Sequence, residues 1–371
     1  MTLVIAAIAA VAALYQLIAI AASVSHKLRR PVWMPADLPP VSVLKPVHGL
    51  DDGFYEAIRS QAEQDYAQFE LLFGVSDTAD PAVAAIDRLM RDFPNAAIRL
   101  IICPTKAPNR KVGVLMDLAA EARHPVFVVN DSDISVERNY LSNVIAPLAD
   151  PAIGLVTCVY RAEARDWPSR WEALAVATDF APSTLVAPFF GVSEFGLGST
   201  LAFRRSVLDR IGGFASVADY LADDYQLGCK LHALGLRNMI SDVVVSTRLA
   251  AGSWPRAWKH QLRWARTIRF SRAGGYYGLP VTFATLWALV AALFGMWWTA
   301  IALLVIRLAM AIAAGWFVLG SRDVLRYFYL IPVRDLSGVV VWIAGLFGDT
   351  VQWRDRHLKL DRSGRIAGFL Q

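Results

Sequence analysis

The chain has 371 residues, of which 56% are hydrophobic and 19% charged, and its mean hydropathy is +0.40. This composition excludes a wholly soluble protein, a disordered chain, a collagen-like fibre and a disulfide-stapled secreted domain. Asp, Glu, Lys and Arg are absent from Met1–Ser25 and from Ala273–Ile306, so the charge lies mainly between the two. The spacing of Cys103, Cys158 and Cys229 fits neither a zinc site nor a bridge framework, which predicts small buried thiols in a reducing cytosol.

The N-terminal apolar run predicts a membrane span. Leu3–Val24 is long enough to cross a hydrocarbon core of about 30 Å, and the basic residues Lys27, Arg29 and Arg30 follow it. A cleaved signal peptide has its basic residues before the apolar core, so we expect a signal anchor over residues 1–26. By the positive-inside rule, the N-terminus is outside and the chain after Arg30 begins in the cytoplasm.

A second membrane region is predicted over residues 273–353. Leu279–Leu319 is roughly twice the length of one span and has Gly295 near its middle, which predicts a helical hairpin. Leu336–Phe347 is shorter, and a basic tail over residues 354–371, which begins at Arg354, follows it. A re-entrant or interfacial helix and a further span are therefore both open there. We expect an integral membrane protein whose basic charge faces anionic lipid rather than nucleic acid.

Residues 27–40, which include Pro31, form a basic and proline-rich linker to a cytoplasmic domain over residues 41–272. In this domain short apolar runs alternate with amphipathic helical stretches. The predicted strands are Val41–Val47, Phe69–Ser76, Ile98–Cys103, Val126–Asn130 and Ile153–Tyr160, and the predicted helices are Gly53–Gln64, Pro81–Asp92, Lys111–Ala122 and Asn139–Leu148. This pattern predicts an α/β fold with a mostly parallel sheet covered by helices, which binds its ligand at the carboxyl ends of the strands.

Carboxylates follow two of these strands. Asp77 and Asp80 come after the second strand, and the Asp131-x-Asp133 pair comes after the fourth. Two carboxylates on one turn suit a hard cation such as Mg²⁺ or Mn²⁺ that bridges phosphates. A helix-capping loop is the ordinary alternative for an isolated Asp-x-Asp.

Other charged residues also point to the sheet end. Lys45 lies inside an apolar strand, so we expect it to pair with a carboxylate there, because a buried unpaired ammonium is costly. Lys111 either binds a phosphate or is a solvated helix start. Asp223 and Asp224 open a helix, where capping explains one carboxylate and a general base or a metal contact explains the other.

A helix before the hairpin carries a basic and aromatic cluster. Arg263 and Arg266 are predicted on one face, with Trp264 between them and His260 one turn earlier. A membrane-interface helix is the ordinary reading. Farther back, Gly191–Thr200 either lines a lipid entrance or is an ordinary loop.

The order of these motifs resembles the ceramide glucosyltransferase family of membrane-bound GT-A glycosyltransferases. The matching segments are Val43-Leu44-Lys45-Pro46, Val75 to Pro81, Asn109-Arg110-Lys111-Val112, Asp131-Ser132-Asp133, Asp223-Asp224-Tyr225 and Arg263-Trp264. The resemblance implies a GT-A fold with membrane helices at both ends. It places Lys45, Asp77, Asp80, Lys111 and Asp131 around the nucleotide sugar and Asp131 and Asp133 at a metal site. It implies Asp224 as the catalytic base and His260, Arg263 and Trp264 as the Gln/Arg-x-x-Arg-Trp motif, although His260 departs from that pattern.

By this resemblance the chain is an inverting glycosyltransferase that uses Mg²⁺ or Mn²⁺. It moves a hexose from a UDP-sugar donor, most simply UDP-glucose, to the hydroxyl of a membrane lipid acceptor such as ceramide. The related hopanoid-biosynthesis enzymes, with UDP-N-acetylglucosamine as donor, share the same motifs and are the alternative. A processive polysaccharide synthase needs more membrane helices than the sequence predicts. A non-catalytic membrane protein is likewise less favoured.

Overall fold

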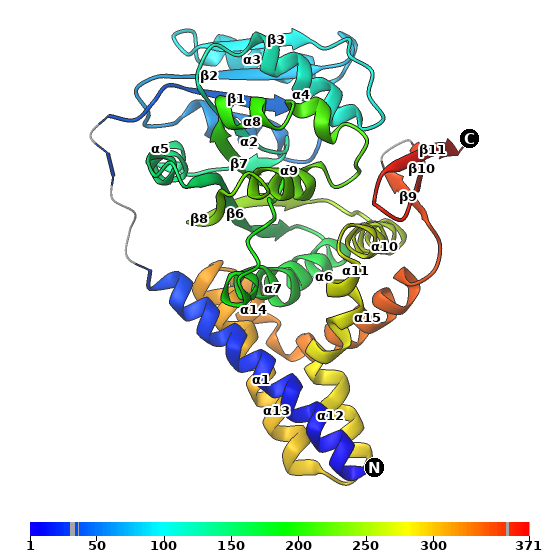
Figure 1. The fold of residues 1–371 in the computed structure, drawn as a ribbon. Helices are drawn as coiled ribbons and strands as arrows, with labels where there is room; N and C mark the ends of the chain where they lie inside the picture. Colours follow the sequence, from blue (N-terminus) through cyan, green and yellow to red (C-terminus); the bar gives the residue numbers. More distant parts are fainter. Residues whose placement is uncertain (30–33, 36, 354–355, 371) are drawn as a thin grey trace. The chain divides into compact units, whose positions relative to one another are not determined.

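The computed structural model describes residues 1–29, 34–35, 37–353 and 356–370 (Figure 1). Arg30, Pro31 and Arg354, which belong to the predicted basic cluster, linker and tail, lie outside these ranges. The chain divides into two compact units. The sheet unit contains Arg30–Tyr160 and Val192–Arg248, and the helical unit contains Met1–Arg29, Arg161–Gly191 and Leu249–Gln371. This division differs from the predicted domain over residues 41–272, because two of its segments fold with the apolar helices.

The sheet has eight strands in the order β3-β2-β1-β4-β7-β6-β8-β5. Their bounds are β1 (Val41–Pro46), β2 (Phe69–Val75), β3 (Ile98–Ile102), β4 (Val126–Val129), β5 (Ile134–Ser135), β6 (Ile153–Ala164), β7 (Leu201–Arg204) and β8 (Arg237–Leu249). β1 pairs in parallel with β2 and β4, and β2 pairs in parallel with β3. β7 runs antiparallel to β4 and β6, and β5 runs antiparallel to β8. The sheet is therefore mixed, with the expected parallel half at its N-terminal strands.

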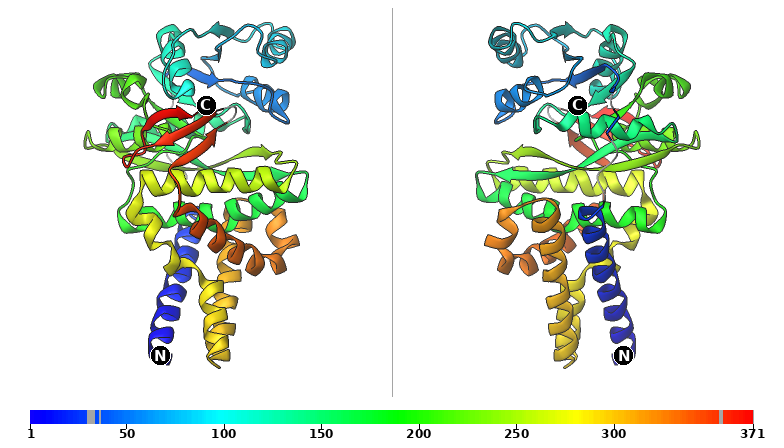
Figure 2. Two further views of the ribbon diagram at one scale, coloured as in Figure 1. Left: turned by 90° about the vertical axis from the view of Figure 1, so that its right-hand side faces the viewer. Right: turned by 90° about the vertical axis from the view of Figure 1, so that its left-hand side faces the viewer.

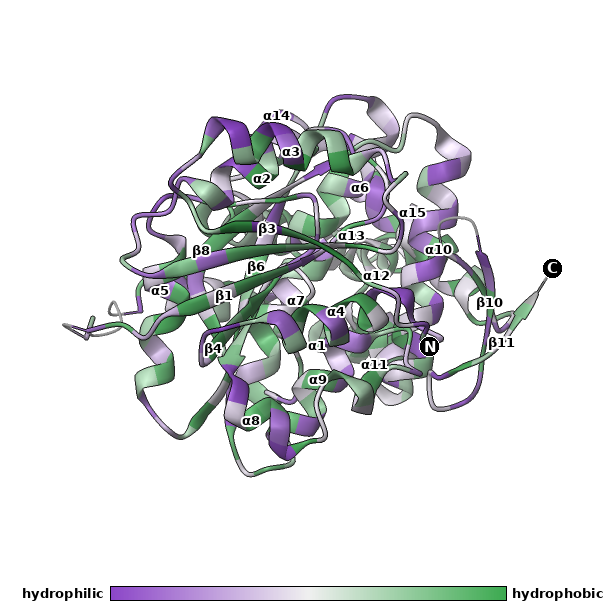
Figure 3. Ribbon diagram, turned by 90° about the horizontal axis from the view of Figure 1, so that it is seen from above, coloured by the Kyte–Doolittle hydropathy of each residue, from purple (hydrophilic) through white to green (hydrophobic). Residues whose placement is uncertain are grey.

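Successive side chains of the central strands point into two separate cores. Val43 faces a core that contains residues of α2 (Phe54–Ala62), α3 (Ala82–Asp92) and α5 (Tyr140–Ile145). Leu44 faces the other core, which contains residues of α4 (Arg110–Glu121), α8 (Arg205–Arg210) and α9 (Asp223–His232). Figure 3 shows β1 and β4 mostly in the green of hydrophobic residues. Both faces are covered, which explains why these strands lack a polar side.

The helical unit holds the apolar helices. α1 (Thr2–Lys27) packs along α12 (Ala284–Leu293) and α13 (Trp297–Ala311), and Figure 2 shows the three side by side. The break between α12 and α13 contains Gly295 at φ +75°, so the predicted anchor and hairpin are both present as helices. The last predicted apolar patch, Leu336–Phe347, lies in α15 (Ile331–Gly345) except for its last two residues.

Within the described residues, four helices are long and apolar enough to cross a membrane. They are Thr2–Lys27, Trp167–Phe190, Trp297–Val318 and Phe328–Gly345, and a bent pair, Ala273–Thr282 with Ala284–Leu293, is a fifth candidate. The sequence pattern missed Trp167–Phe190, because charged residues interrupt its apolar positions. This run joins α6 (Trp167–Ala175), the π-helical turn η2 (Val176–Phe180), α7 (Ala181–Val186) and the 3-10 turn η3 (Ala187–Phe190).

Other elements complete the helical unit. They are α10 (Trp254–Ser271), α11 (Ala273–Gly278), a second π-helical turn η6 (Ile312–Val318), α14 (Arg322–Arg326) and a three-stranded sheet of β9 (Thr350–Trp353), β10 (Arg356–Leu360) and β11 (Ile366–Leu370).

The three cysteines all belong to the sheet unit and are free thiols. Cys103 and Cys158 are buried, and Cys229 is partly exposed.

Candidate active site

The parallel strands bring the predicted polar residues to one edge of the sheet. Because β1 pairs in parallel with β2 and with β4, the carboxyl ends of all three strands lie at the same edge. Lys45 lies near the end of β1, Asp77 follows β2, and Asp131 follows β4. This is the edge at which α/β sheets bind their ligands.

Lys111 is the positive centre of the site. Its Nζ lies 2.8 Å from Oδ1 of Asp131 and 3.4 Å from Oδ2 of Asp223. Burial lowers the pKa of Lys111, but the charges of Asp131 and Asp223 outweigh it, so the pKa is raised and the ammonium stays charged. Lys111, whose side chain is 15% exposed, is therefore an ion-pair partner rather than a solvated helix start.

Asn109 fixes the helix start that presents Lys111. Its Oδ1 accepts from the backbone N–H of Val112 at 3.3 Å and caps α4. Its Nδ2 donates to the carbonyl of Tyr220 and to Oδ1 of Asp223, over 2.8 Å and 3.2 Å. Sequence reasoning placed Asn109 only in a motif and missed this link between α4 and α9.

Asp224 lies in the first turn of α9. Its Oδ2 accepts from the backbone N–H of Gly198 at 2.7 Å, and its Oδ1 accepts from that of Tyr225 at 2.8 Å. Burial, and then the charge of Asp223, raise the pKa of Asp224 to about 6, although Lys111 opposes the rise. Such a carboxylate is ionised at neutral pH and is poised to accept a proton.

Gly198 packs against the charged groups. A Cβ on this residue would lie 2.9 Å from Oδ2 of Asp131, 3.3 Å from Oδ2 of Asp224 and 3.5 Å from Nζ of Lys111. The segment Gly191–Thr200, predicted to line a lipid entrance or to be an ordinary loop, thus holds the backbone that contacts the acidic site. Sequence reasoning missed this, because no residue-type signal marks a glycine that packs on side chains so distant in the chain.

Asp133 is the second carboxylate of the predicted metal pair. Thr247 of β8 donates a hydrogen bond to its Oδ2. Burial, and then the charge of Asp131, raise the pKa of Asp133. The partly desolvated Asp133 and the partly exposed Asp131 therefore repel each other, and a divalent cation would relieve that repulsion.

The carboxylates of Asp131 and Asp133 fit a metal ion that also binds the substrate. Among the described residues, no group of three or more His, Cys, Asp or Glu side chains is arranged to hold a metal ion. Mg²⁺ is commonly bound through one or two carboxylates together with substrate phosphates, and Mn²⁺ also prefers oxygen ligands. Asp131 and Asp133 supply two carboxylates of this kind.

The hydrogen-bond partners of Lys45 differ from the prediction that it pairs with a carboxylate. It is fully buried, and its Nζ donates to two neutral oxygens, Oδ1 of Asn130 at 2.7 Å and the carbonyl of Asp131 at 3.0 Å. Burial lowers the pKa of Lys45 to about 7, while Asp133 and Asp131 act against this shift. Neutral acceptors suffice because the ammonium is only partly charged near neutral pH.

Asp77 and Asp80, which share one motif, have different surroundings. Asp77 is exposed, and its Oδ1 accepts from the backbone N–H of Ala79 at 2.9 Å. The side chain of Asp80 is only 6% exposed and accepts from the backbone N–H groups of Gly49, at 3.1 and 2.9 Å, and Ala82, at 2.9 Å. Asp80 thus holds the turn after β1, and Asp77 is accessible to a ligand.

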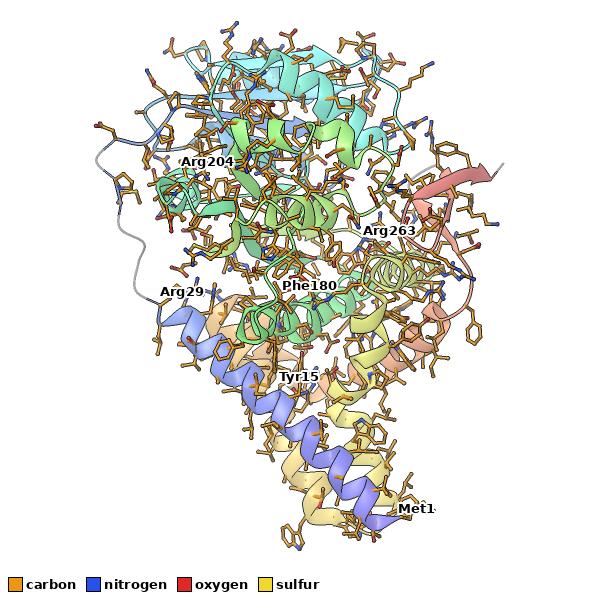
Figure 4. All side chains as sticks on the ribbon, in the orientation of Figure 1. Met1, Tyr15, Arg29, Phe180, Arg204 and Arg263 are labelled. Atoms are coloured by element: carbon orange, nitrogen blue, oxygen red, sulfur yellow. The ribbon has the colours of Figure 1, made fainter. Side chains whose placement is uncertain are left out.

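His260, Arg263 and Trp264 belong to α10 of the helical unit, whereas the carboxylates and lysines described above belong to the sheet unit. Nδ1 of His260 lies 2.8 Å from Oε1 of the buried Glu172, and its ring centroid is 4.8 Å from that of Trp264. Figure 4 labels Arg263 on α10. His260 is therefore held by a carboxylate and an indole of its own unit.

The mixed sheet covered by helices, with acidic residues at its carboxyl edge, defines a GT-A-type nucleotide-sugar-binding fold. A solved mannosyltransferase from Pyrobaculum calidifontis, in complex with GDP-Man and Mn²⁺, matches 90% of this chain and 97% of its own, with a TM-score of 0.53. The two sequences are 22% identical, so this likeness concerns the fold alone.

The chain belongs to glycosyl transferase family 21, whose model matches residues 1–366. Ceramide glucosyltransferase 1 of Caenorhabditis elegans is 28% identical over 58% of this chain and 47% of its own length. Ceramide glucosyltransferase 3 of the same organism is 29% identical over 62% of this chain and 50% of its own. The chain spans about half the length of these curated relatives. The predicted family, GT-A fold and glycosyltransferase class are confirmed.

Proposed function

We propose that this glycosyltransferase moves a hexose, most simply from UDP-glucose, to a hydroxyl of a membrane lipid such as ceramide, with inversion at the anomeric carbon. The worm relatives carry the name ceramide glucosyltransferase, and the apolar helices suit an acceptor that stays in the bilayer. One observation carries the proposal: the carboxylate of Asp224, with a pKa of about 6, lies among Gly198, Asp223 and Lys111.

Asp224 is the general base in this proposal. A lipid hydroxyl is a weak nucleophile near neutral pH and becomes a better one as its proton is taken. The proton moves to a carboxylate oxygen of Asp224 while the lipid oxygen bonds to the anomeric carbon. The bond from that carbon to the diphosphate breaks in the same displacement, and UDP leaves with the electron pair.

The remaining residues bind the donor. Lys111 places a full positive charge, and Lys45 a partial one, beside the carboxyl ends of β1 and β4, where a diphosphate would lie. Mg²⁺ or Mn²⁺ held by Asp131 and Asp133 would neutralise charge on the leaving diphosphate. We assign Asp77 to the nucleotide itself, because its side chain is accessible, and Asp80 to the loop that borders the nucleotide.

We also propose that the diphosphate is bound by His260, Arg263 and Trp264, because they occupy the positions of the Gln/Arg-x-x-Arg-Trp motif in sequence. Arg263 is expected to contribute positive charge to the donor, so Arg263→Ala raises the donor KM. His260, paired with Glu172, orients Trp264. His260→Gln, which restores the usual residue of the motif, is expected to retain activity.

The catalytic residues are proposed to act on the cytoplasmic side. The basic residues Lys27 and Arg29 lie at the C-terminal end of α1 and just after it, and basic residues are retained in the cytoplasm. A cysteine introduced at exposed Asp219 is expected to react with a membrane-impermeant maleimide in inverted vesicles and not in right-side-out ones. The opposite pattern contradicts this orientation.

The function is tested with the full chain in nanodiscs. The protein is incubated with Mn²⁺, UDP-glucose or UDP-N-acetylglucosamine, and either ceramide or a hopanoid alcohol, and the lipid products are identified by mass spectrometry. A β-glucosylated ceramide supports the proposal. A hopanoid product selects the alternative acceptor, and transfer to neither lipid contradicts both.

The base assignment needs a matched pair of variants. Asp224→Asn is expected to lower kcat by about 10²-fold or more. Asp219→Asn changes an exposed aspartate five positions earlier in the chain and is expected to leave kcat unchanged. Full turnover by Asp224→Asn shows that another group takes the proton.

A further inference from the structure

A buried charge network joins the apolar helices of the helical unit. Arg307 of α13 is 3% exposed, and its Nε and Nη2 donate to the two oxygens of Asp335 at 2.9 and 2.6 Å. Thr285 of α12 also donates to Asp335, which lies on α15. Ionisable groups on membrane helices are costly, and they commonly serve a function rather than packing alone.

Asp179 completes the network from the π-helical turn η2. Its Oδ1 lies 2.9 Å from Nη2 of Arg307, and its Oδ2 lies 3.7 Å from Nη2 of Arg334. Arg334 and Asp335 are nearly buried, with side chains 5% and 8% exposed, whereas that of Asp179 is 46% exposed. π-Helical turns often occur at functional sites, and this one makes a carboxylate accessible on an apolar helix.

Two hydroxyls lie beside Asp179. Ser183 follows Asp179 by one turn, and its Oγ donates to the backbone carbonyl of Asp179 at 2.6 Å. The hydroxyl of Tyr15, on α1, lies 3.2 Å from the same Oγ. Figure 4 labels Tyr15 part-way along α1 and also Phe180, the neighbour of Asp179 in sequence. We call this group the hydroxyl-carboxylate site; it consists of Asp179, Ser183 and Tyr15.

The charges of the network indicate which ligand would fit. Arg307 and Arg334 are balanced by Asp179 and Asp335, so an added ionic headgroup would be left without a counter-charge. Asp179 supplies acceptor oxygens, and the hydroxyls of Tyr15 and Ser183 can both donate and accept. The site therefore offers both donors and acceptors to a group that is polar but uncharged.

We propose that the hydroxyl-carboxylate site binds the uncharged polar head of the acceptor lipid, a head that carries hydroxyl or amide N–H groups. Asp179 accepts from such a group, and Tyr15 and Ser183 exchange their mutual hydrogen bond for bonds to it. The ligand is a lipid, because Tyr15 and Ser183 lie on two helices that are apolar enough to cross a membrane. This inference rests on the proposed function for the identity of the acceptor.

The test removes the hydroxyls and leaves the charges in place. Tyr15→Phe and Ser183→Ala are each expected to raise the acceptor KM about 3- to 10-fold and to leave the donor KM unchanged. Thr184→Val is the matched control. Thr184 also donates to a carbonyl four residues earlier, that of Phe180, but its side chain is buried. Asp179→Asn also breaks the bond with Arg307, so the hydroxyl variants decide the result.

Binding is measured separately from turnover. A ceramide with a photoreactive acyl chain is crosslinked to the protein in nanodiscs without donor, in competition with ceramide or its di-O-methyl ether. The inference is supported if ceramide competes more strongly than its di-O-methyl ether and if this difference is lost in the Tyr15→Phe, Ser183→Ala double variant. This result supports the inference even if no sugar transfer is found. Equal competition, or an unchanged acceptor KM in an enzyme that transfers sugar, overturns the inference and leaves the proposed function standing.

Discussion

The backbone N–H of Gly198 donates to Oδ2 of Asp224 over 2.7 Å, which ties the loop before β7 to the first turn of α9. The same glycine faces Asp131 and Lys111, so one residue without a side chain packs against the proposed base, a proposed metal ligand and a cation. The spacing of these charged groups therefore depends on the position of one backbone segment.

Replacing Gly198 by alanine is expected to lower kcat by roughly 10- to 100-fold, because the new Cβ displaces the carboxylates of Asp131 and Asp224. Steady-state kinetics and a thermal unfolding curve for each variant separate this effect from a loss of folding. Gly274→Ala is the control, since a Cβ there meets open space. An unchanged kcat in Gly198→Ala would show that the carboxylates tolerate the displacement.

The pH dependence of transfer is expected to report Asp224. Below its pKa of about 6 the base is protonated and cannot take the hydroxyl proton, so kcat falls toward about tenfold per pH unit on the acid side. Lys111→Met removes a charge that lowers the pKa of Asp224, so the acid limb of the profile moves to higher pH.

Lys106→Met, which changes an exposed lysine near α4, is expected to leave the profile in place. The two variants are compared by kcat against pH at saturating substrates. If the acid limb is the same in Lys111→Met and in the unaltered protein, Asp224 is not the group that limits the rate at low pH.

Thr247 is expected to position Asp133, the proposed metal ligand. Chelation should abolish transfer, and added Mn²⁺ or Mg²⁺ should restore it. Thr247→Val removes the hydrogen bond to Asp133 and is expected to raise the metal concentration for half-activation roughly tenfold. Thr105→Val removes a similar bond to Asp117, at 2.6 Å, and serves as the control. Equal metal requirements in both variants would contradict the assignment.

Lys45 is expected to make stability depend on pH. Its pKa is about 7 when folded and about 10.4 when unfolded, so between these values the unfolded chain holds more protons. The free energy of unfolding therefore rises with pH through this window, by at most about 1.4 kcal/mol per pH unit. Lys45→Met lacks this contribution.

The prediction is checked by melting curves in detergent at pH 7 and pH 9. The unaltered protein should gain more stability over this interval than Lys45→Met, and the exposed Lys106→Met variant should behave as the unaltered protein does. The same pH slope in all three would show that Lys45 does not titrate in this range.

Much of the fold follows from local sequence patterns. Apolar β-branched runs predicted β1 to β4 within a residue or two. β1, β2 and β4 are buried along nearly their whole length, and a strand that is buried on both faces has no polar side. The uncharged N-terminal stretch predicted α1, because a membrane span needs about 20 apolar residues. The carboxyl ends of parallel strands meet at one edge, so the places of Asp77 and Asp131 could also be predicted.

What the tertiary structure alone decided is which distant side chains meet. Asp133 bonds to Thr247, 114 residues away, and Asp179 to Arg307, 128 residues away. Local periodicity carries no information on such pairs, because they depend on strand order and on the packing of whole helices. The sequence by itself determined the family, the apolar N-terminal helix and the hairpin, and it predicted which types of side chain lie at the candidate site. The folded chain alone determined that Gly198 bonds to Asp224, the proposed base, and that a neutral charge network lies within the apolar helices.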